Sequence, residues 1–116
     1  MGRDGLLGAF EEMVLVVVAR GGGDAYGMTV RREIEERTGR EITIGAVYST
    51  LDRLETKGYL RSRLGDSADG RRGRARRHFR VMPSGVGALA RVREMRDGLW
   101  DGLNLSDVAA EAESGS

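Results

Sequence analysis

Apolar side chains recur every three or four residues in four segments of this chain, the spacing of helices that bury one face. The first segment covers residues 6–20, where a run of valines favours a strand by propensity alone. Its length and the three glycines after it, residues 21–23, favour a buried helix that ends in a turn. The second segment is expected to start at Asp24 as its N-cap, to run to about Thr38 and to stop at Gly39.

The third segment has one apolar face and one small, polar face. It is expected to be capped by Thr43 and to end near Lys57, and a short strand is expected just before it, over residues 41–44. Its inner positions are Val47, Leu51 and Leu54. Its outer face can approach another molecule closely, through Gly45, Tyr48, Ser49, Thr50, Asp52 and Arg53.

Two stretches with alternating polarity, residues 59–64 and 75–81, predict the strands of a hairpin. The side chains expected to face inward are Leu60, Leu64, Phe79 and Val81. The connection is about ten residues, which is long for a hairpin, and it is rich in Gly, Asp, Ser and Arg. His78 falls on the other side and is interpreted as an ordinary exposed strand residue.

The fourth helical segment is expected to begin at Pro83 and to extend to about Leu103. Its four glycines weaken it as an isolated helix, so it needs a partner, and a second copy of the chain is expected to supply one. The positions expected at this dimer interface are Val86, Leu89, Val92, Met95, Leu99, Trp100 and Leu103. Residues 104–116 are small and acidic, and they are expected to be disordered.

Composition narrows the class of protein. The 116 residues suffice for one domain, with 40% apolar and 32% charged residues. The chain has no cysteine and one histidine, so neither a disulfide framework nor a metal site or other cofactor is expected. The longest apolar run, residues 13–19, is too short to cross a membrane, and a cytoplasmic location is expected. No pattern of catalytic residues predicts an enzyme.

Charge is distributed unevenly along the chain. Residues 61–80 hold eight arginines and two aspartates, a local balance of +6, whereas residues 101–116 carry four carboxylates and no basic residue. A small, polar helix followed by a basic hairpin indicates a winged helix-turn-helix, whose helix reads the DNA major groove while its wing contacts phosphates. The base-reading helix is expected to use Thr43, Gly45, Tyr48, Ser49, Thr50 and Arg53. The wing contacts are expected to be Arg71, Arg72, Arg74, Arg76 and Arg77.

Several short segments then resemble a known family. They are 24–27 (DAYG), 44–48 (IGAVY), 51–58 (LDRLETKG), 76–80 (RRHFR) and 83–85 (PSG). Over residues 6–103 the chain resembles the PadR-like family of bacterial transcriptional regulators, in the short subgroup with a single C-terminal helix. Two positions depart from the family pattern: Ser49 stands where proline is frequent, and Met82 where threonine is usual.

The resemblance implies a mainly α-helical fold with a small β-hairpin. It divides the chain into a winged helix-turn-helix over residues 1–82, a dimerisation helix over 83–103 and the tail over 104–116. It also implies a homodimer on a pseudo-palindromic operator in double-stranded DNA, usually acting as a repressor and in some members released by a small molecule.

Three questions stay open at this stage. Tyr48 either contacts DNA or is a half-buried tyrosine that supports its helix. Trp100 either stacks on a small aromatic effector, as in some drug-responsive members of the family, or packs in the dimer interface. The alternative to an operator-specific regulator is a winged-helix module that binds a protein or RNA through its basic face.

Overall fold

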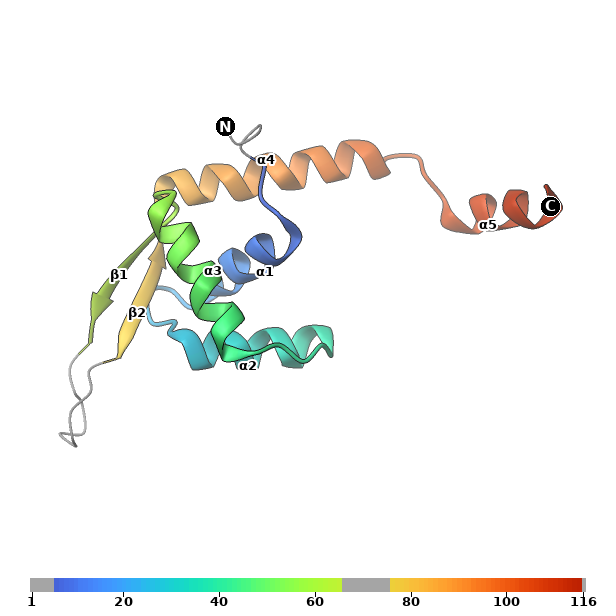
Figure 1. Cartoon of the computed structure of the whole chain (residues 1–116). Coiled ribbons are helices and arrows are strands. Elements are labelled where there is room, and N and C mark those ends of the chain that lie inside the picture. Colours follow the sequence, from blue (N-terminus) through green and yellow to red (C-terminus); the bar gives the residue numbers. More distant parts are fainter. Residues whose placement is uncertain (1–5, 66–75, 116) are drawn as a thin grey trace.

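The computed structural model describes residues 6–65 and 76–115 and confirms a mainly helical fold with one small hairpin. Its elements are α1 (Ala9–Arg20), α2 (Gly27–Thr38), α3 (Ile44–Thr56), β1 (Leu60–Leu64), β2 (Arg77–Val81), α4 (Pro83–Trp100) and α5 (Leu105–Ser114). Figure 1 shows α1, α2 and α3 packed together, the hairpin on one side of them, and α4 extending away toward α5.

Helix α1 begins at Ala9 rather than at residue 6, and it is a helix despite its valines. The Glu11 side chain accepts a hydrogen bond from the Gly8 amide at 3.0 Å, which caps the helix in place of a serine or threonine. Its buried side chains are Val14, Leu15, Val17 and Val18. Gly22 and Gly23 then adopt φ of 62° and 98°, so the glycine run forms the predicted turn.

Helix α2 begins three residues later than its expected cap, Asp24. The Thr29 hydroxyl accepts from the Tyr26 amide at 3.0 Å and thereby caps the helix from within its first turn. Asp24 is exposed instead and lies 3.6 Å from Arg63. Gly39 ends the helix with φ of 73°, as predicted.

The strand expected over residues 41–44 does not form: residues 41–43 have no regular secondary structure, and Ile44 is the first residue of α3. Its Ile42 amide donates to the Glu35 carboxylate at 3.0 Å. A side chain of α2 therefore satisfies the backbone group that a neighbouring strand would have bonded. Helix α3 follows, and Thr43 caps it as predicted by accepting from the Ala46 amide at 3.0 Å.

The hairpin pairs Leu60 with Val81 at one end and Leu64 with Arg77 at the other. Leu60 and Phe79 are buried as predicted, but Leu64 is 71% exposed. Figure 1 shows the reason, because this end of the hairpin projects past the three packed helices. The alternation of side chains continues along the strand where no core remains to cover it.

Helix α4 ends at Trp100, three residues earlier than expected. Its first half packs on the body of its own protomer, where a Cβ atom at Gly85 would lie 2.4 Å from the Tyr59 carbonyl oxygen. Ala88 and Val92 are buried there, at 2% and 3% exposure. The assignment of Val92 to a dimer interface is therefore wrong, because it belongs to the core of the protomer.

No helix in the described ranges is long and apolar enough to cross a membrane.

The expected disorder of residues 104–116 is wrong over most of that range, because Leu105–Ser114 forms α5. The Asn104 side chain caps it by accepting from the amides of Ser106 at 2.8 Å and Asp107 at 3.3 Å. Alanine and glutamate, both strong helix formers, supply five of the residues that follow, positions 109–113. Low hydrophobicity predicted disorder, whereas capping and helix propensity decide the local structure.

Candidate nucleic-acid interface

The outer face of α3 is small, polar and open. Gly45 and Ser49 are exposed there, and Thr43 is exposed at the N-terminal end of the helix. A Cβ atom at Gly45 would meet no other atom within 4 Å, so the backbone itself is accessible at the first turn. The amides of a helix N-terminus favour an anionic partner. This face combines close approach, hydroxyl groups and a positive helix end, which suits contact with a DNA groove.

Tyr48 lies at the edge of this face and supports the helix. A Cβ atom at Gly27 would lie 2.4 Å from Cζ and 2.5 Å from the hydroxyl of Tyr48, so the ring occupies the space that glycine leaves open. The contact joins α3 to the start of α2. Of the two interpretations of Tyr48, this packing favours the supporting role.

Thr50 does not belong to the outer face, and its prediction as a DNA contact is wrong. Its exposure is 2%, and its hydroxyl accepts from Arg53 Nη2 at 3.2 Å. Positions 47, 50, 51 and 54 share one side of a helix, because they are three, four and seven residues apart. The same spacing, already visible in the sequence, places Thr50 on the buried stripe.

Arg53 is held by a carboxylate that sequence reasoning did not identify. Glu11, on α1, lies 2.8 Å from Lys57 Nζ and 3.4 Å from Arg53 Nε. Burial raises the pKa of Glu11, but the hydrogen bonds from Lys57, Gly8 and Arg53 outweigh it and hold that pKa below its ordinary value. Glu11 thus fixes the end of α3 against α1, and Arg53 stays half exposed.

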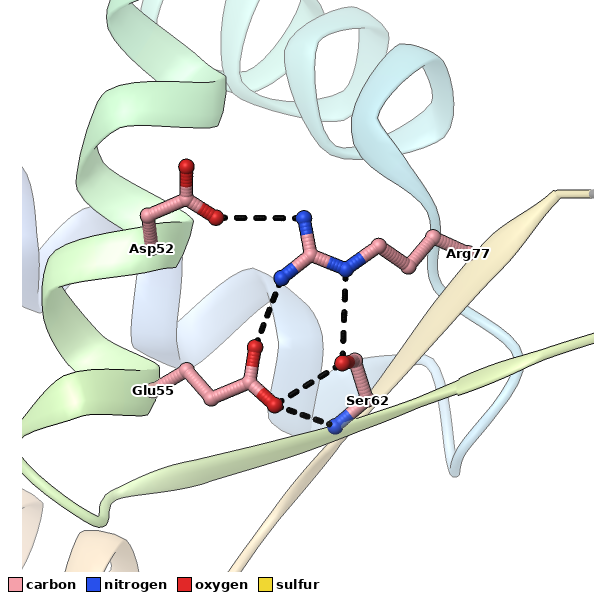
Figure 2. Close-up of polar contacts among 4 residues, drawn as sticks. All are labelled: Asp52, Glu55, Ser62 and Arg77. Atoms are coloured by element: carbon pink, nitrogen blue, oxygen red, sulfur yellow. Dashed lines mark hydrogen bonds and ion pairs between the residues drawn. The ribbon is translucent and has the colours of Figure 1, made fainter.

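Arg77 is likewise engaged within the protein, and its contact with a DNA phosphate stays a prediction. Figure 2 shows its guanidinium between α3 and β1. Nη1 lies 3.1 Å from Asp52, Nη2 lies 2.7 Å from Glu55, and Nε donates to the Ser62 hydroxyl at 3.3 Å. A planar guanidinium suits this set of acceptors because its N–H groups point outward in a fixed fork.

Glu55 completes this cluster, which we call the Arg77 clasp: Asp52, Glu55, Ser62 and Arg77. The second oxygen of Glu55 accepts from the Ser62 amide at 3.1 Å and from its hydroxyl at 2.8 Å. Burial raises the pKa of Glu55, but the bonds from Ser62 and Arg77 leave it below its ordinary value. Burial lowers the pKa of Arg77, and the bonds to Asp52 and Glu55 reverse the effect. The clasp ties the hairpin to α3 through charged hydrogen bonds.

The remaining predicted wing contacts are only partly described. Arg76 is exposed, and its guanidinium lies 4.5 Å from the centre of the Tyr26 ring. The same ring makes an edge contact with His78, whose Nδ1 is 3.0 Å from the Asp24 carbonyl oxygen. His78 is therefore half-buried and hydrogen-bonded, contrary to expectation. Arg71, Arg72 and Arg74 lie outside the described residues.

Two further arginines of the basic stretch 61–80 were not among the predicted wing contacts. Arg61 and Arg80 face each other across the strands, and both are exposed. Like charges placed directly opposite in a sheet repel each other. Among the described residues no ion pair includes either of them, so an external anion would relieve the repulsion. The cross-strand register that joins them is not visible in the sequence.

The described residues, 6–65 and 76–115, hold no cluster of residues suited to a metal ion.

Comparison with known proteins places this site in context. The sequence pattern of the family described as Transcriptional regulator PadR-like family matches residues 14–91. That stretch contains α2, α3, the hairpin and the first half of α4. Among curated proteins, none matches this chain.

Solved structures share the fold at low sequence identity. A PadR family transcriptional regulator from Eggerthella lenta is 25% identical, with a TM-score of 0.63 over 77% of this chain and 75% of that one. A transcriptional regulator from Clostridium thermocellum is 24% identical, with a TM-score of 0.65 over 78% and 82%. RosR from H. salinarum is 22% identical, with a TM-score of 0.67 over 95% and 96%.

Proposed function

Because this chain belongs to the PadR-like family of transcriptional regulators, we propose that it binds a specific operator in double-stranded DNA and represses transcription there. The observation that carries the proposal is the rigid pairing of an open, polar α3 face with an arginine-bearing hairpin through the Arg77 clasp. The family comprises regulators, so the chain is not an enzyme. Binding to DNA would place it in the cytoplasm.

The proposed contacts fall into two groups. Gly45 and Ser49 would read base edges, because they are exposed four residues apart on the outer face of α3, and Thr43 would do so from the exposed N-terminal end of the helix. Arg61 and Arg80 would bind phosphates and supply affinity that depends on salt rather than on sequence. The wing residues Arg71, Arg72, Arg74 and Arg76, and half-exposed Arg53, are proposed as additional phosphate contacts.

The functional unit is proposed to be a homodimer. Helix α4 presents one continuous apolar stripe: Ala88 and Val92 cover the protomer's own core, and Met95 and Leu99 continue the same side of the helix beyond it. Leu99 is 74% exposed. A second protomer related by a two-fold axis would cover this stripe and hold two α3 helices about 34 Å apart, one turn of DNA.

A small aromatic effector is proposed as an additional partner. Trp100 is 54% exposed at the end of α4, so its ring is open to stacking in a single protomer. Quenching of Trp100 fluorescence by planar aromatic compounds, beyond that of free tryptophan, would support the effector. An unchanged spectrum across such a panel would leave Trp100 as a residue of the dimer interface.

The operator proposal is tested by competition. Labelled DNA from the region upstream of the protein's own gene should stay bound to the protein when unlabelled random DNA of equal length is added in excess. Footprinting of the retained fragment should show two protected half-sites one helical turn apart. Equal competition by random DNA would contradict operator specificity and favour a module that uses its basic face for another partner.

A further inference from the structure

A small hollow lies on the outer face of the hairpin, opposite the face that carries the Arg77 clasp. Its volume is about 100 Å³. Three arginines contribute to its lining, Arg61, Arg63 and Arg80, together with His78 and the turn residue Gly23. The four side chains share this face because successive residues of a strand point to opposite sides of a sheet. We call this feature the hairpin hollow.

Arg63 is held in position at one side of the hollow. Its Nη2 donates to the Gly23 carbonyl oxygen at 3.2 Å and lies 3.6 Å from the Asp24 carboxylate. The Asp24 side chain is 87% exposed, so water screens this ion pair. Arg63 therefore has a fixed place while its positive charge remains available to an anion.

Arg61 and Arg80 add two positive charges that the protomer leaves unbalanced. They lie opposite each other across the strands, and no ion pair of the described residues includes them. Within the described ranges the hollow has no carboxylate in its lining. An anion placed between like charges replaces their repulsion by attraction. The hollow therefore favours an anion that carries more than one charge.

The size and the donors of the hollow favour a single phosphate group. Its volume equals that of about three water molecules at about 30 Å³ each, which suits one tetrahedral oxyanion and is too small for a nucleoside. Guanidinium groups present paired N–H donors that match phosphate oxygens. A phosphate monoester carries about −1.5 to −2 at neutral pH, whereas each phosphodiester of DNA carries one negative charge. Three arginines favour the more highly charged group.

We propose that the hairpin hollow binds one phosphate group from solution, supplied by inorganic phosphate or by the monoester of a small molecule. Binding joins β1, β2 and the turn at Gly23, and thereby stabilises the wing. It also occupies Arg61 and Arg80, which are the arginines proposed above to contact DNA. For this second effect the inference rests on the proposed function: free phosphate weakens DNA binding beyond the effect of its ionic strength.

Thermal unfolding without DNA tests the site. Sodium phosphate is titrated at constant ionic strength against sodium chloride. The melting temperature of the wild type should rise along a saturable curve, on the order of 5 °C when phosphate exceeds its dissociation constant about tenfold. Isothermal titration calorimetry should give one phosphate per chain. Glycerol phosphate distinguishes the two sources, since tighter binding than inorganic phosphate assigns the hollow to a monoester and weaker binding assigns it to the free ion.

Arg61→Gln removes one charge from the hollow and keeps a polar side chain. It should weaken phosphate binding on the order of tenfold or more, the effect of losing one hydrogen-bonded charge. In chloride alone this variant should stay folded, because it relieves the repulsion with Arg80. Arg91→Gln is the matched control, since Arg91 is an exposed arginine of α4 outside the hollow. General effects of phosphate on hydration act on all three proteins alike.

Filter binding to duplex DNA at constant ionic strength tests the second effect. Saturating phosphate should weaken DNA binding by the wild type several-fold relative to chloride, and it should have no such effect on Arg61→Gln. If DNA binding by the wild type does not change while phosphate still stabilises the free protein, the hollow binds phosphate but does not share its arginines with DNA, and the second effect is overturned.

Two other outcomes separate the site from the proposed function. Equal rises in melting temperature for the wild type and both variants, or a rise that never saturates, would mean that phosphate only screens the basic surface, and would overturn the proposal. Equal competition by random DNA in the operator experiment would contradict the proposed function, whereas phosphate binding by the free protein would remain.

Discussion

Single residues set the geometry of the α3 face, and Gly27 shows how. The Tyr48 ring fills the space beside Gly27, where any side chain would collide with it. Gly27 has no left-handed φ, so its role is close approach rather than unusual backbone conformation. The start of α2 and the outer edge of α3 are thereby fixed against each other by one missing Cβ atom.

Gly27→Ala should therefore destabilise the protein by about 1 kcal/mol, the low end of the range for overpacking, because the half-exposed Tyr48 ring can shift outward. Chemical denaturation of the variant and the wild type measures the difference. Gly45→Ala is the matched control, because a Cβ atom there meets open space. If both variants lose the same stability, the Tyr48 contact is not the cause.

The pH dependence of stability should report on Glu11. Its pKa is lower in the folded state than in the unfolded state, so the carboxylate contributes stability above its unfolded pKa and loses it as pH falls through the folded pKa. Glu11→Gln should cost about 1–3 kcal/mol at neutral pH, through weakened bonds to charged partners. The difference in unfolding free energy between Glu11→Gln and the wild type should shrink as the pH falls below about 4.

Thermal or chemical unfolding at a series of pH values measures this convergence. Glu36→Gln provides the control, since Glu36 is exposed on α2. A constant difference between Glu11→Gln and wild type across the acidic range would show that the lost stability comes from altered packing rather than from the charge.

At the scale of elements, the Arg77 clasp determines the angle between the hairpin and α3. Arg77→Lys keeps the positive charge but replaces the planar fork by a point charge. We expect operator affinity to fall by about tenfold, or about 1.4 kcal/mol, because a wing that is no longer held at a fixed angle to α3 places its arginines less accurately on the DNA. The dependence of affinity on salt should not change, because Arg77 binds carboxylates rather than phosphates.

If operator binding by the Arg77→Lys variant depends less on salt than binding by the wild type, Arg77 leaves the clasp to bind DNA.

The double variant Arg61→Ala and Arg80→Ala is expected to change the salt dependence of binding. Removing one arginine that binds a phosphate lowers the slope of log K against log salt by about 0.9, so the double variant should lower it by nearly 2. Binding to operator and to random DNA should weaken alike. Filter binding at several salt concentrations distinguishes the two variants.

Local patterns predicted most of the elements correctly, because periodicity and caps are local properties. The Thr43 cap, the Gly39 stop and the buried valines of α1 required no knowledge of the tertiary fold. Thr50 and residues 104–116 were misjudged although helix spacing and capping are local signals. Elsewhere a distant segment decides the outcome. Leu64 is exposed because the core ends before it, and Arg77 turns inward because Asp52 and Glu55 lie opposite.

At the scale of the whole molecule, one protomer leaves half of the apolar stripe of α4 uncovered. The half of the stripe that contains Val92 is buried, while the half that contains Leu99 projects beyond the body. The chain is also elongated, with principal extents of 65, 29 and 21 Å. An extended helix with an uncovered apolar side is stable when a second chain covers it, and two copies supply each other's cover.

Leu99→Asp should therefore shift the protein to monomers at micromolar concentration, because the dimer would bury an unpaired carboxylate. Ala90→Asp places the same charge on the opposite side of α4 and should leave the dimer intact. Sedimentation measures both, and circular dichroism checks that each protomer stays folded. The monomer should still bind one half-site but lack the gain from binding two at once, so operator affinity should fall toward that for random DNA. A Leu99→Asp variant that remains dimeric would place the interface elsewhere on the molecule.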